Sequence, residues 1–306
     1  MAPSSSSESP AAAVARRLVL ESATVEVCDA LASDGIDAVV LKGPAVARWL
    51  YPDEPTRSFV DVDLLVAGNR VRAAGATLKK LGFRRAHGSG HAEVWGRPFD
   101  GVAVDLHSVL AGVAPRAPAW EVLSAGTEAM ELASGVVQVL SPPARALHVV
   151  LHAAQHGLQE ERTIADLERA LDLVTAEEWD EAAELARGLE AEGAFAAGLR
   201  LTLRGREEAA RLSLPHRRSL ETAVRAEGAP PGVLGLYRFF KTPGVRARAR
   251  LLADELFPSA GFMRSVSPMA RRGRLGLAAA YAWRPFWLAS RLWPALRTWR
   301  RARSSR

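Results

Sequence analysis

The sequence has only one cysteine, Cys28, among its 306 residues, which excludes an internal disulfide and any cysteine-rich metal site. We expect Cys28 to be a small core residue. No signal-peptide pattern opens the chain, and residues 1–10 are polar, which predicts a disordered leader. The sequence also contains no P-loop, no GxGxxG motif and no internal repeat. These absences predict a cytoplasmic, globular protein.

Acidic residues are missing from the end of the chain. None follows Glu255, whereas residues 256–306 contain eleven arginines, so the net charge of +6 divides into −5 for residues 1–255 and +11 for the tail. Lysine is rare as well, with four lysines against 36 arginines, a bias typical of GC-rich bacterial genomes. With 48% hydrophobic residues, the chain can bury two separate cores.

Hydrophobic periodicity and turn residues predict an α/β region in the first half of the chain. Gly43 and Pro44 mark a turn into a helix, and Gly82 suits the end of one. We expect helices at about 11–33, 44–50 and 69–81, strands at about 36–41, 59–66, 92–96 and 102–109, and a hairpin at about 130–140.

The pattern changes at Ser141-Pro142-Pro143, which predicts a helix that reaches about residue 158. Only helices are expected after it, near 163–174, 177–191, 194–213, 216–226 and 243–256. The predicted organisation is a leader (1–10), an α/β domain (11–141), a helical domain (142–256) and a basic segment rich in Trp and Arg (257–306).

Two aspartates lie two positions apart in the second predicted strand. Because side chains alternate along a strand, Asp61 and Asp63 point to the same face, about 7 Å apart along the chain. Val60, Val62 and Leu64 then point the other way, into a core. Two carboxylates on one face of an apolar strand repel each other, and a bound divalent cation such as Mg²⁺ would offset that cost. A solvated edge strand is the alternative interpretation.

A third aspartate has the same alternation around it. Val102, Val104 and Leu106 share the core face of the later strand, whereas Asp105 and His107 share the other. If the two strands are neighbours, Asp105 completes a three-carboxylate site able to hold two Mg²⁺ ions about 4 Å apart. Asp105 would also orient or deprotonate an attacking group. His107 is expected either beside the metal or in a structural hydrogen bond.

Two basic residues suit contact with phosphates. Lys42 ends the first predicted strand beside the Gly43 turn, a position suited to a phosphate ligand; an ordinary surface lysine is the alternative. Arg57 precedes Asp61 by four residues and suits either a triphosphate or a structural ion pair. We therefore expect Lys42, Gly43 and Arg57 to bind nucleotide.

Three histidines are spaced by four residues in the helix that follows Pro142. His148, His152 and His156 therefore form one stripe along it. A stripe of this kind can line an interdomain cleft, make a plain core contact or bind a transition metal. We favour the cleft, with His152 and His156 beside His107.

The basic tail combines its arginines with Trp283, Trp287, Trp293 and Trp299. Its longest uncharged apolar stretch is too short to span a membrane, and Pro294 is expected to interrupt any long helix. Three interpretations remain: packing on the helical domain, peripheral contact with an anionic membrane surface, or binding of nucleic acid or an acidic partner. Packing is favoured.

Several motifs occur in a fixed order over about residues 36 to 175. They are Leu41-Lys42-Gly43, Arg57-x-Phe59-x-Asp61-Val-Asp63-Leu-Leu-Val66, Leu81-Gly82-Phe83, Val104-Asp105-Leu106-His107, Leu147-His148, His152-Ala-Ala-Gln-His156 and Asp166-Leu167. This order resembles the uncharacterised nucleotidyltransferase family of the DNA polymerase beta superfamily.

The resemblance implies an α+β fold, with a mixed sheet flanked by helices and then an all-helical domain. It implies transfer of a nucleoside monophosphate from an NTP, with metal bound by Asp61 and Asp63 and a third ligand or base role for Asp105. The wider superfamily has Gly-Ser ahead of the aspartate pair, whereas this chain has Lys42-Gly43. We expect Lys42 to replace the missing hydroxyl.

The leading functional hypothesis is a Mg²⁺-dependent nucleotidyltransferase that acts on a small molecule or a peptide. One alternative is a non-catalytic binding or scaffold module that keeps the fold. Another is a metal-dependent glycosyltransferase, because Asp-x-Asp also coordinates metal with nucleotide-sugars. That class needs a sizeable nucleotide-binding half before the motif, and only about 50 ordered residues precede Asp61.

Overall fold

The structure is a computed structural model that describes residues 10–53, 59–88, 92–114, 116–216, 244–258 and 260–304, together with Phe239 and Thr242. The chain forms two compact units. The first comprises Met1–His148 and Arg169–Glu190, and the second comprises Val149–Glu168 and Ala191–Arg306. None of the described helices combines the length and the apolar character needed to cross a membrane.

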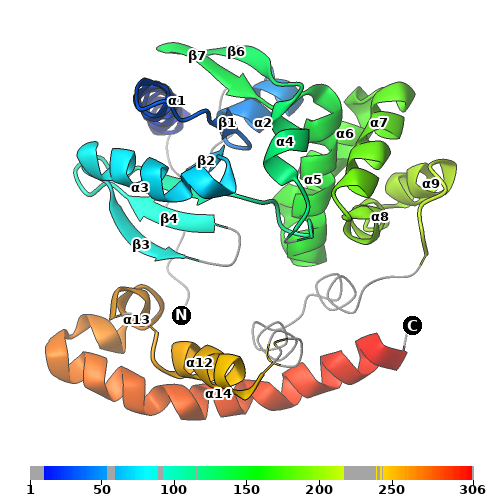
Figure 1. Cartoon of the computed structure of the whole chain (residues 1–306). Coiled ribbons are helices and arrows are strands. Elements are labelled where there is room, and N and C mark those ends of the chain that lie inside the picture. Colours follow the sequence, from blue (N-terminus) through cyan, green and yellow to red (C-terminus); the bar gives the residue numbers. More distant parts are fainter. Residues whose placement is uncertain are drawn as a thin grey trace. The chain divides into compact units, whose positions relative to one another are not determined.

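The first unit is built on a mixed seven-stranded sheet with the order β3-β4-β5-β2-β1-β7-β6 (Figure 1). Strand β2 runs parallel to β5, and β1 runs parallel to β7, whereas the other neighbouring pairs are antiparallel. The strands are β1 (Val39–Val40), β2 (Val62–Leu65), β3 (Arg84–Gly88), β4 (Ala92–Gly96), β5 (Ala103–His107), β6 (Glu128–Leu132) and β7 (Gly135–Val139).

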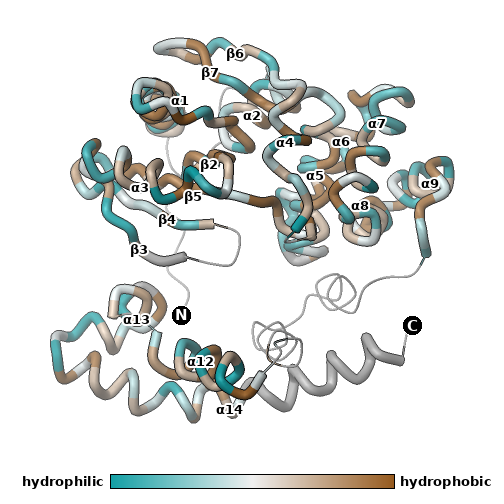
Figure 2. Tube along the Cα trace, in the orientation of Figure 1, coloured by the Kyte–Doolittle hydropathy of each residue, from teal (hydrophilic) through white to brown (hydrophobic). Residues whose placement is uncertain are grey.

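Helices α1 (Pro10–Ser33) and α3 (Val71–Lys80) of the first unit pack on one face of this sheet. Val62, Leu64 and Val104 point to that face and are fully buried. They share a core with Leu31 of α1 and Leu78 of α3. Figure 2 shows the contrast between the largely hydrophobic β2 and β5 and the hydrophilic edge strand β3. The helices are α1 (Pro10–Ser33), α2 (Pro44–Leu50), η1 (Gly68–Arg70), α3 (Val71–Lys80), α4 (Ala119–Ser124) and α7 (Ala176–Gly188).

Helix α5 (Pro142–His156) begins in the first unit and ends in the second. Helix α6 (Glu161–Leu173) also has residues in both units. The other described elements of the second unit are all helical: η2 (Gly157–Gln159), α8 (Glu192–Leu199), α9 (Leu203–Arg211), α12 (Val245–Leu256), α13 (Ala260–Val266), η3 (Met269–Arg271) and α14 (Gly273–Ser304).

The predicted fold class is confirmed, with a mixed sheet flanked by helices and a helical region after it. Two short elements, β3 and α4, were not predicted. The single helix expected at 194–213 is two helices, because Thr202 begins a new one by accepting a hydrogen bond on its side chain from the Gly205 N–H. The helix expected at 216–226 lies outside the described residues apart from its first residue. The division into four segments stays a prediction.

Helix α14 corrects the expectation that proline ends the tail helix. It runs without interruption from Gly273 to Ser304, through both Pro285 and Pro294. A proline removes one N–H and crowds the carbonyl four residues earlier, but the hydrogen bonds of the turns on either side remain. The packing of the first part of α14 on α13 and η3, through Ala280 and Met263, also holds the helix in place.

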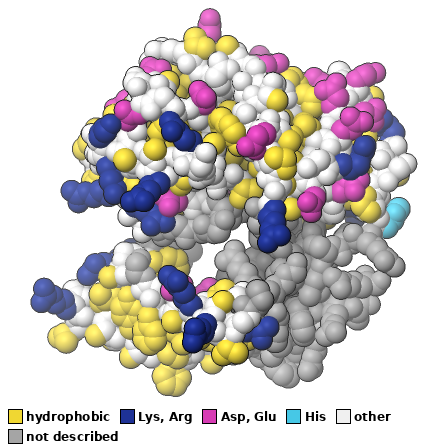
Figure 3. All heavy atoms as spheres, in the orientation of Figure 1, with side chains coloured by type: hydrophobic (Ala, Val, Ile, Leu, Met, Phe, Trp, Pro, Cys, Tyr) yellow, Lys and Arg dark blue, Asp and Glu magenta, His cyan; other side chains and the backbone are white. Residues whose placement is uncertain are grey.

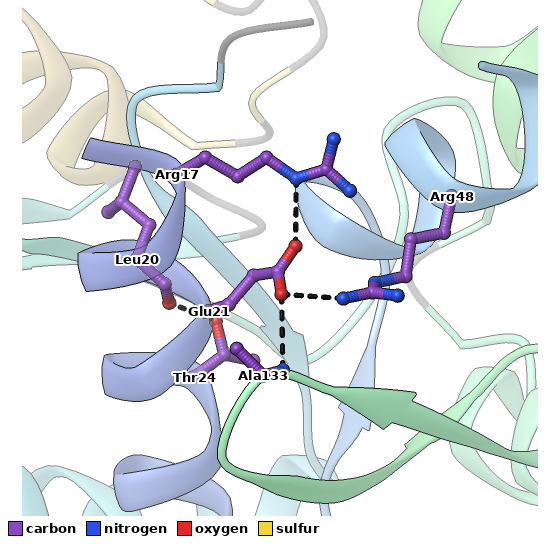
Figure 4. A network of polar contacts seen from close by, with 6 residues as sticks. All are labelled: Arg17, Leu20, Glu21, Thr24, Arg48 and Ala133. Atoms are coloured by element: carbon purple, nitrogen blue, oxygen red, sulfur yellow. Dashed lines mark hydrogen bonds and ion pairs between the residues drawn. The ribbon is translucent and has the colours of Figure 1, made fainter. Parts of the chain in front are cut away.

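A buried glutamate connects three elements of the first unit (Figure 4). Glu21 of α1 is 1% exposed, and its carboxylate accepts hydrogen bonds from Arg17 Nε at 2.9 Å and Arg48 Nη2 at 2.8 Å. It also accepts one from the Ala133 N–H, in the turn between β6 and β7, at 3.2 Å. Burial opposes ionisation of Glu21, but the hydrogen bonds from Arg48 and Arg17 hold its pKa below the usual range. Glu21 therefore fastens α1 to α2 and to the β6–β7 hairpin.

We expect Glu21→Gln to lower the free energy of unfolding by about 3 kcal/mol, because it leaves a part-buried guanidinium without its counter-charge. Urea unfolding at neutral pH measures the change. Glu184→Gln on α7, whose side chain is 73% exposed, is the matched control and should change stability by less than about 0.5 kcal/mol. Equal effects of the two variants would contradict the assignment.

Candidate active site

The site begins with the pairing of β2 and β5. These strands are parallel neighbours in which Asp63 lies directly opposite Asp105, and Leu65 lies opposite His107. Residues opposite each other in a ladder project to the same face, so both carboxylates emerge on the sheet face away from α1 and α3. The register thus brings together side chains that lie 42 positions apart in the sequence (105 against 63).

Asp63 is the centre of the polar contacts in the site. Its side chain is 1% exposed, and one oxygen, Oδ1, lies 2.9 Å from the Lys42 ammonium and 3.0 Å from His107 Nε2. Ligand atoms of Asp63, Asp105 and His107 all lie within 4.8 Å of one another, close enough for all three to hold one metal ion. Lys42 follows β1, Asp63 lies in β2 and His107 ends β5, and these three strands are neighbours in the sheet.

The strand that was expected at about 59–66 begins only at Val62. Val62 and Leu64 are buried as predicted, but Val60 is 59% exposed and does not reach the core. The reason is that β2 starts at Val62, so Val60 and Asp61 precede the regular strand. Asp61 is half-buried and lies near enough to Asp63 for the two charges to interact.

Gly43 fixes how Lys42 approaches the aspartates. Gly43 has φ of 61°, a conformation that L side chains rarely adopt. A Cβ there would also lie 3.2 Å from the Asp61 carbonyl oxygen and 3.2 Å from the Phe59 ring. The backbone of the turn therefore packs against the start of β2, and this close approach sets Lys42 over Asp63.

Burial and the neighbouring charges shift the pKa values of Asp63, Asp61 and Lys42 in different directions. Burial opposes ionisation of Asp63, but the Lys42 ammonium and His107 outweigh it and hold the pKa of Asp63 well below its usual range. Burial and the charge of Asp63 raise the pKa of Asp61 to about 6. Burial alone would lower the pKa of Lys42, yet Asp63, Asp61 and Asp105 raise it. One carboxylate of the cluster is thus firmly ionised, and another ionises with difficulty.

His148 is part of this environment, although sequence reasoning placed it only in a helical stripe. It is 6% exposed, near Lys42, Asp63 and His107, and forms a hydrogen bond with the Leu41 backbone. Burial, and then the Lys42 charge, lower its pKa to about 3, so it is neutral at physiological pH. The motif Leu147-His148 was the available signal, but periodicity does not show which turn of α5 meets the sheet.

The other predicted residues divide into two groups. Arg57 lies outside the described residues. His152 and His156 belong to the second unit, where their rings lie edge to face with centroids 4.6 Å apart. Their place beside the carboxylates stays a prediction.

The first unit therefore combines a mixed sheet with two parallel neighbouring strands, β2 and β5, that each carry an aspartate. The model of the uncharacterised nucleotidyltransferase family matches residues 7–204, about two thirds of the chain, so the chain belongs to this family. No curated protein sequence matches this chain.

Among solved structures, two of the aminoglycoside-resistance factor ANT(2'')-Ia are similar to this chain at 18% identity. The solution structure has a TM-score of 0.41, and the crystal structure with adenylyl-2"-tobramycin has a TM-score of 0.44. Each covers 56% of this chain, and the matches span 94% and 97% of those chains. A nucleotidyltransferase-like protein from Paracoccidioides brasiliensis is 21% identical, with a TM-score of 0.36, covering 57% of this chain and 92% of its own.

Asp61 makes the stability of the metal-free protein depend on pH. The unfolded chain loses the Asp61 proton from about pH 4, whereas the folded chain keeps it until about pH 6. Folding is therefore disfavoured increasingly as the pH rises from about 4 to 6. We expect Asp61→Asn to raise the free energy of unfolding at pH 7.5 by about 1–2 kcal/mol, after discounting for partial exposure, and to have little effect at pH 4.

Urea unfolding in EDTA at the two pH values measures this difference. Asp37→Asn, at an exposed position just before β1, is the matched control and should leave stability unchanged at both. A variant at position 61 that is less stable than the parent at pH 7.5 would contradict the charge assignment.

Proposed function

We propose that this chain is a Mg²⁺-dependent nucleotidyltransferase that moves a nucleoside monophosphate from an NTP to a small-molecule or peptide acceptor. The observation that supports it most strongly is the β2–β5 register, which sets Asp63 and Asp105 side by side with Asp61 and His107 nearby. Membership of the nucleotidyltransferase family supports the same reaction class.

The donor set fits the metal that the reaction requires. Mg²⁺ takes oxygen ligands and is commonly bound by one or two carboxylates together with substrate phosphates. Asp63 and Asp105 would hold such an ion, with Asp61 completing a two-metal site. The raised pKa of Asp61 is consistent with this, because burial and then the charges of Asp63 and Asp105 oppose its ionisation, and a bound cation would offset both effects. When bound, the ion would neutralise charge on the phosphates and activate the attacking oxygen.

The protein's own groups have separate tasks in this proposal. The acceptor oxygen forms a bond to the α-phosphorus, the bond to the pyrophosphate oxygen breaks, and Asp105 orients the acceptor or takes its proton. Lys42 contributes a fixed positive charge for the phosphates in place of the superfamily hydroxyl, and we expect Gly43 and Arg57 to contribute to nucleotide binding as well. His107 holds Asp63 in position through its Nε2 atom, 3.0 Å from Oδ1.

One observation favours the alternative of a non-catalytic binding module. Lys42 already neutralises the Asp63 carboxylate through an ion pair with Oδ1 at 2.9 Å, and this ion pair competes with a metal ion for the same side chain. A site stabilised in this way could bind anions without chemistry. The following experiment separates the two functions and also tests the glycosyltransferase alternative.

We expect Asp63→Asn and Asp105→Asn each to weaken Mg²⁺-dependent NTP binding and pyrophosphate release by at least about 100-fold. The reason is that losing even a residue that merely orients a metal ligand costs about 10–100-fold. Calorimetry with Mg²⁺ and each NTP measures binding, and a coupled pyrophosphate assay measures turnover. Asp37→Asn should behave like the parent.

Unchanged NTP binding in both variants would refute the metal-site assignment. Tight, carboxylate-dependent NTP binding with no pyrophosphate released on any acceptor tested would favour the binding module. Metal-dependent binding of UDP-glucose in preference to NTPs would favour the glycosyltransferase.

A further inference from the structure

Helix α14 has an inward face that is anchored by the helices before it. Ala280 is 4% exposed and packs with Met263 and Ala270, and the Tyr281 hydroxyl donates to the Pro258 carbonyl at 2.5 Å. Arg284 is 8% exposed, and its Nε donates to the Glu255 carbonyl at 2.6 Å. Residues 280, 281 and 284 lie on the same side of a helix, so this side of α14 is occupied within the chain.

The outward face of α14 is apolar and exposed. Leu275 is 87% exposed, Trp283 58% and Phe286 68%, with the exposed Ala279 and Ala282 between them. The spacing of these five positions follows one face of an α-helix. The Trp283 and Phe286 rings stack with centroids 6.0 Å apart. This set, the outward stripe, is unusual because soluble proteins rarely expose large apolar side chains in a contiguous row.

The charge near the outward stripe is mainly positive. Arg264, Arg271, Arg272 and Arg274 are all exposed beside the first turns of α14, and no acidic residue follows Glu255. Figure 3 shows hydrophobic side chains gathered over the α12–α14 segment with Lys and Arg side chains around them. The surface therefore offers apolar area and positive charge together.

We propose that the outward stripe binds the surface of a membrane that contains anionic lipid. Trp, Phe and Leu on one face with arginines around them match a helix that lies in the membrane interface, with its apolar side a few ångströms below the headgroups. Arginine side chains at the edge reach back to the lipid phosphates. A second copy of the chain would bring two surfaces of like charge together, and nucleic acid would leave the apolar row without a partner.

Vesicle flotation with the full chain tests this proposal. We expect the parent to float with vesicles of phosphatidylglycerol and phosphatidylcholine in equal parts, and much less with phosphatidylcholine alone. Trp283→Ala with Phe286→Ala should weaken partitioning by on the order of tenfold or more, the effect of removing two large apolar groups from a buried position. Arg271→Gln, Arg272→Gln and Arg274→Gln together should weaken it similarly, with the remaining binding less sensitive to salt.

Phe99→Ala is the matched control, because Phe99 is an aromatic residue 77% exposed in the first unit. It should float like the parent, and circular dichroism should show all variants folded. The proposal is overturned if the parent stays unbound or if the Trp283 and Phe286 variant floats like the parent. It is also overturned if the chain prefers a DNA duplex to the vesicles and keeps that preference in the variant. None of these outcomes bears on the proposed transferase activity, which the pyrophosphate assay follows separately.

Discussion

The ionised carboxylate of Asp63, almost completely removed from water, is the constraint on which the site depends. An isolated buried carboxylate is strongly disfavoured, so the fold must supply compensating charge and hydrogen bonds. Lys42 and His107 do so on a single oxygen. Their contacts require β1, β2 and β5 to be neighbours, and the apolar side chains that the same strands present to α1 and α3 stabilise this arrangement. The core on one face thus determines the electrostatics on the other.

The positive charge that compensates Asp63 does little to stabilise the ionised form of Asp61. Burial is the largest cause that raises the pKa of Asp61, and two other carboxylates add to it. The Lys42 ammonium is bonded to Asp63 and lowers the pKa of Asp61 only from a longer range. The two aspartates of one Asp-Val-Asp segment consequently have pKa values displaced in opposite directions. Such a difference between neighbouring carboxylates is characteristic of sites in which acidic groups have distinct roles.

Much of this site was predictable from strand alternation. The alternation predicted that Asp63 and Asp105 point to one face of the sheet and that their apolar neighbours point to the core on the other face. In the structure Val62, Leu64 and Val104 are buried as expected. The register was not predictable, because alternation describes each strand alone and does not say which strands are neighbours. For the same reason periodicity could not bring His148 to Lys42. The exposed Val60 shows that alternation holds only where the ladder has begun.

The sequence predicted the elements whose own apolar pattern determines their structure, and it failed for elements that depend on packing against distant parts of the chain. Strand β3 is a polar edge strand, Arg84–Gly88, that has no apolar alternation to reveal it and exists through its pairing with β4. Pro285 and Pro294 do not end α14. The packing of Ala280 on the preceding helices stabilises this helix, and such long-range packing cannot be read from the sequence.

The conformation of Gly43 limits which residues this position can accept. A serine at position 43 would have to adopt φ of 61° and place its Cβ 3.2 Å from a main-chain oxygen of the aspartate segment. A side chain at this position would therefore press on the segment that holds the acids, and a hydroxyl there would require the turn to be rebuilt.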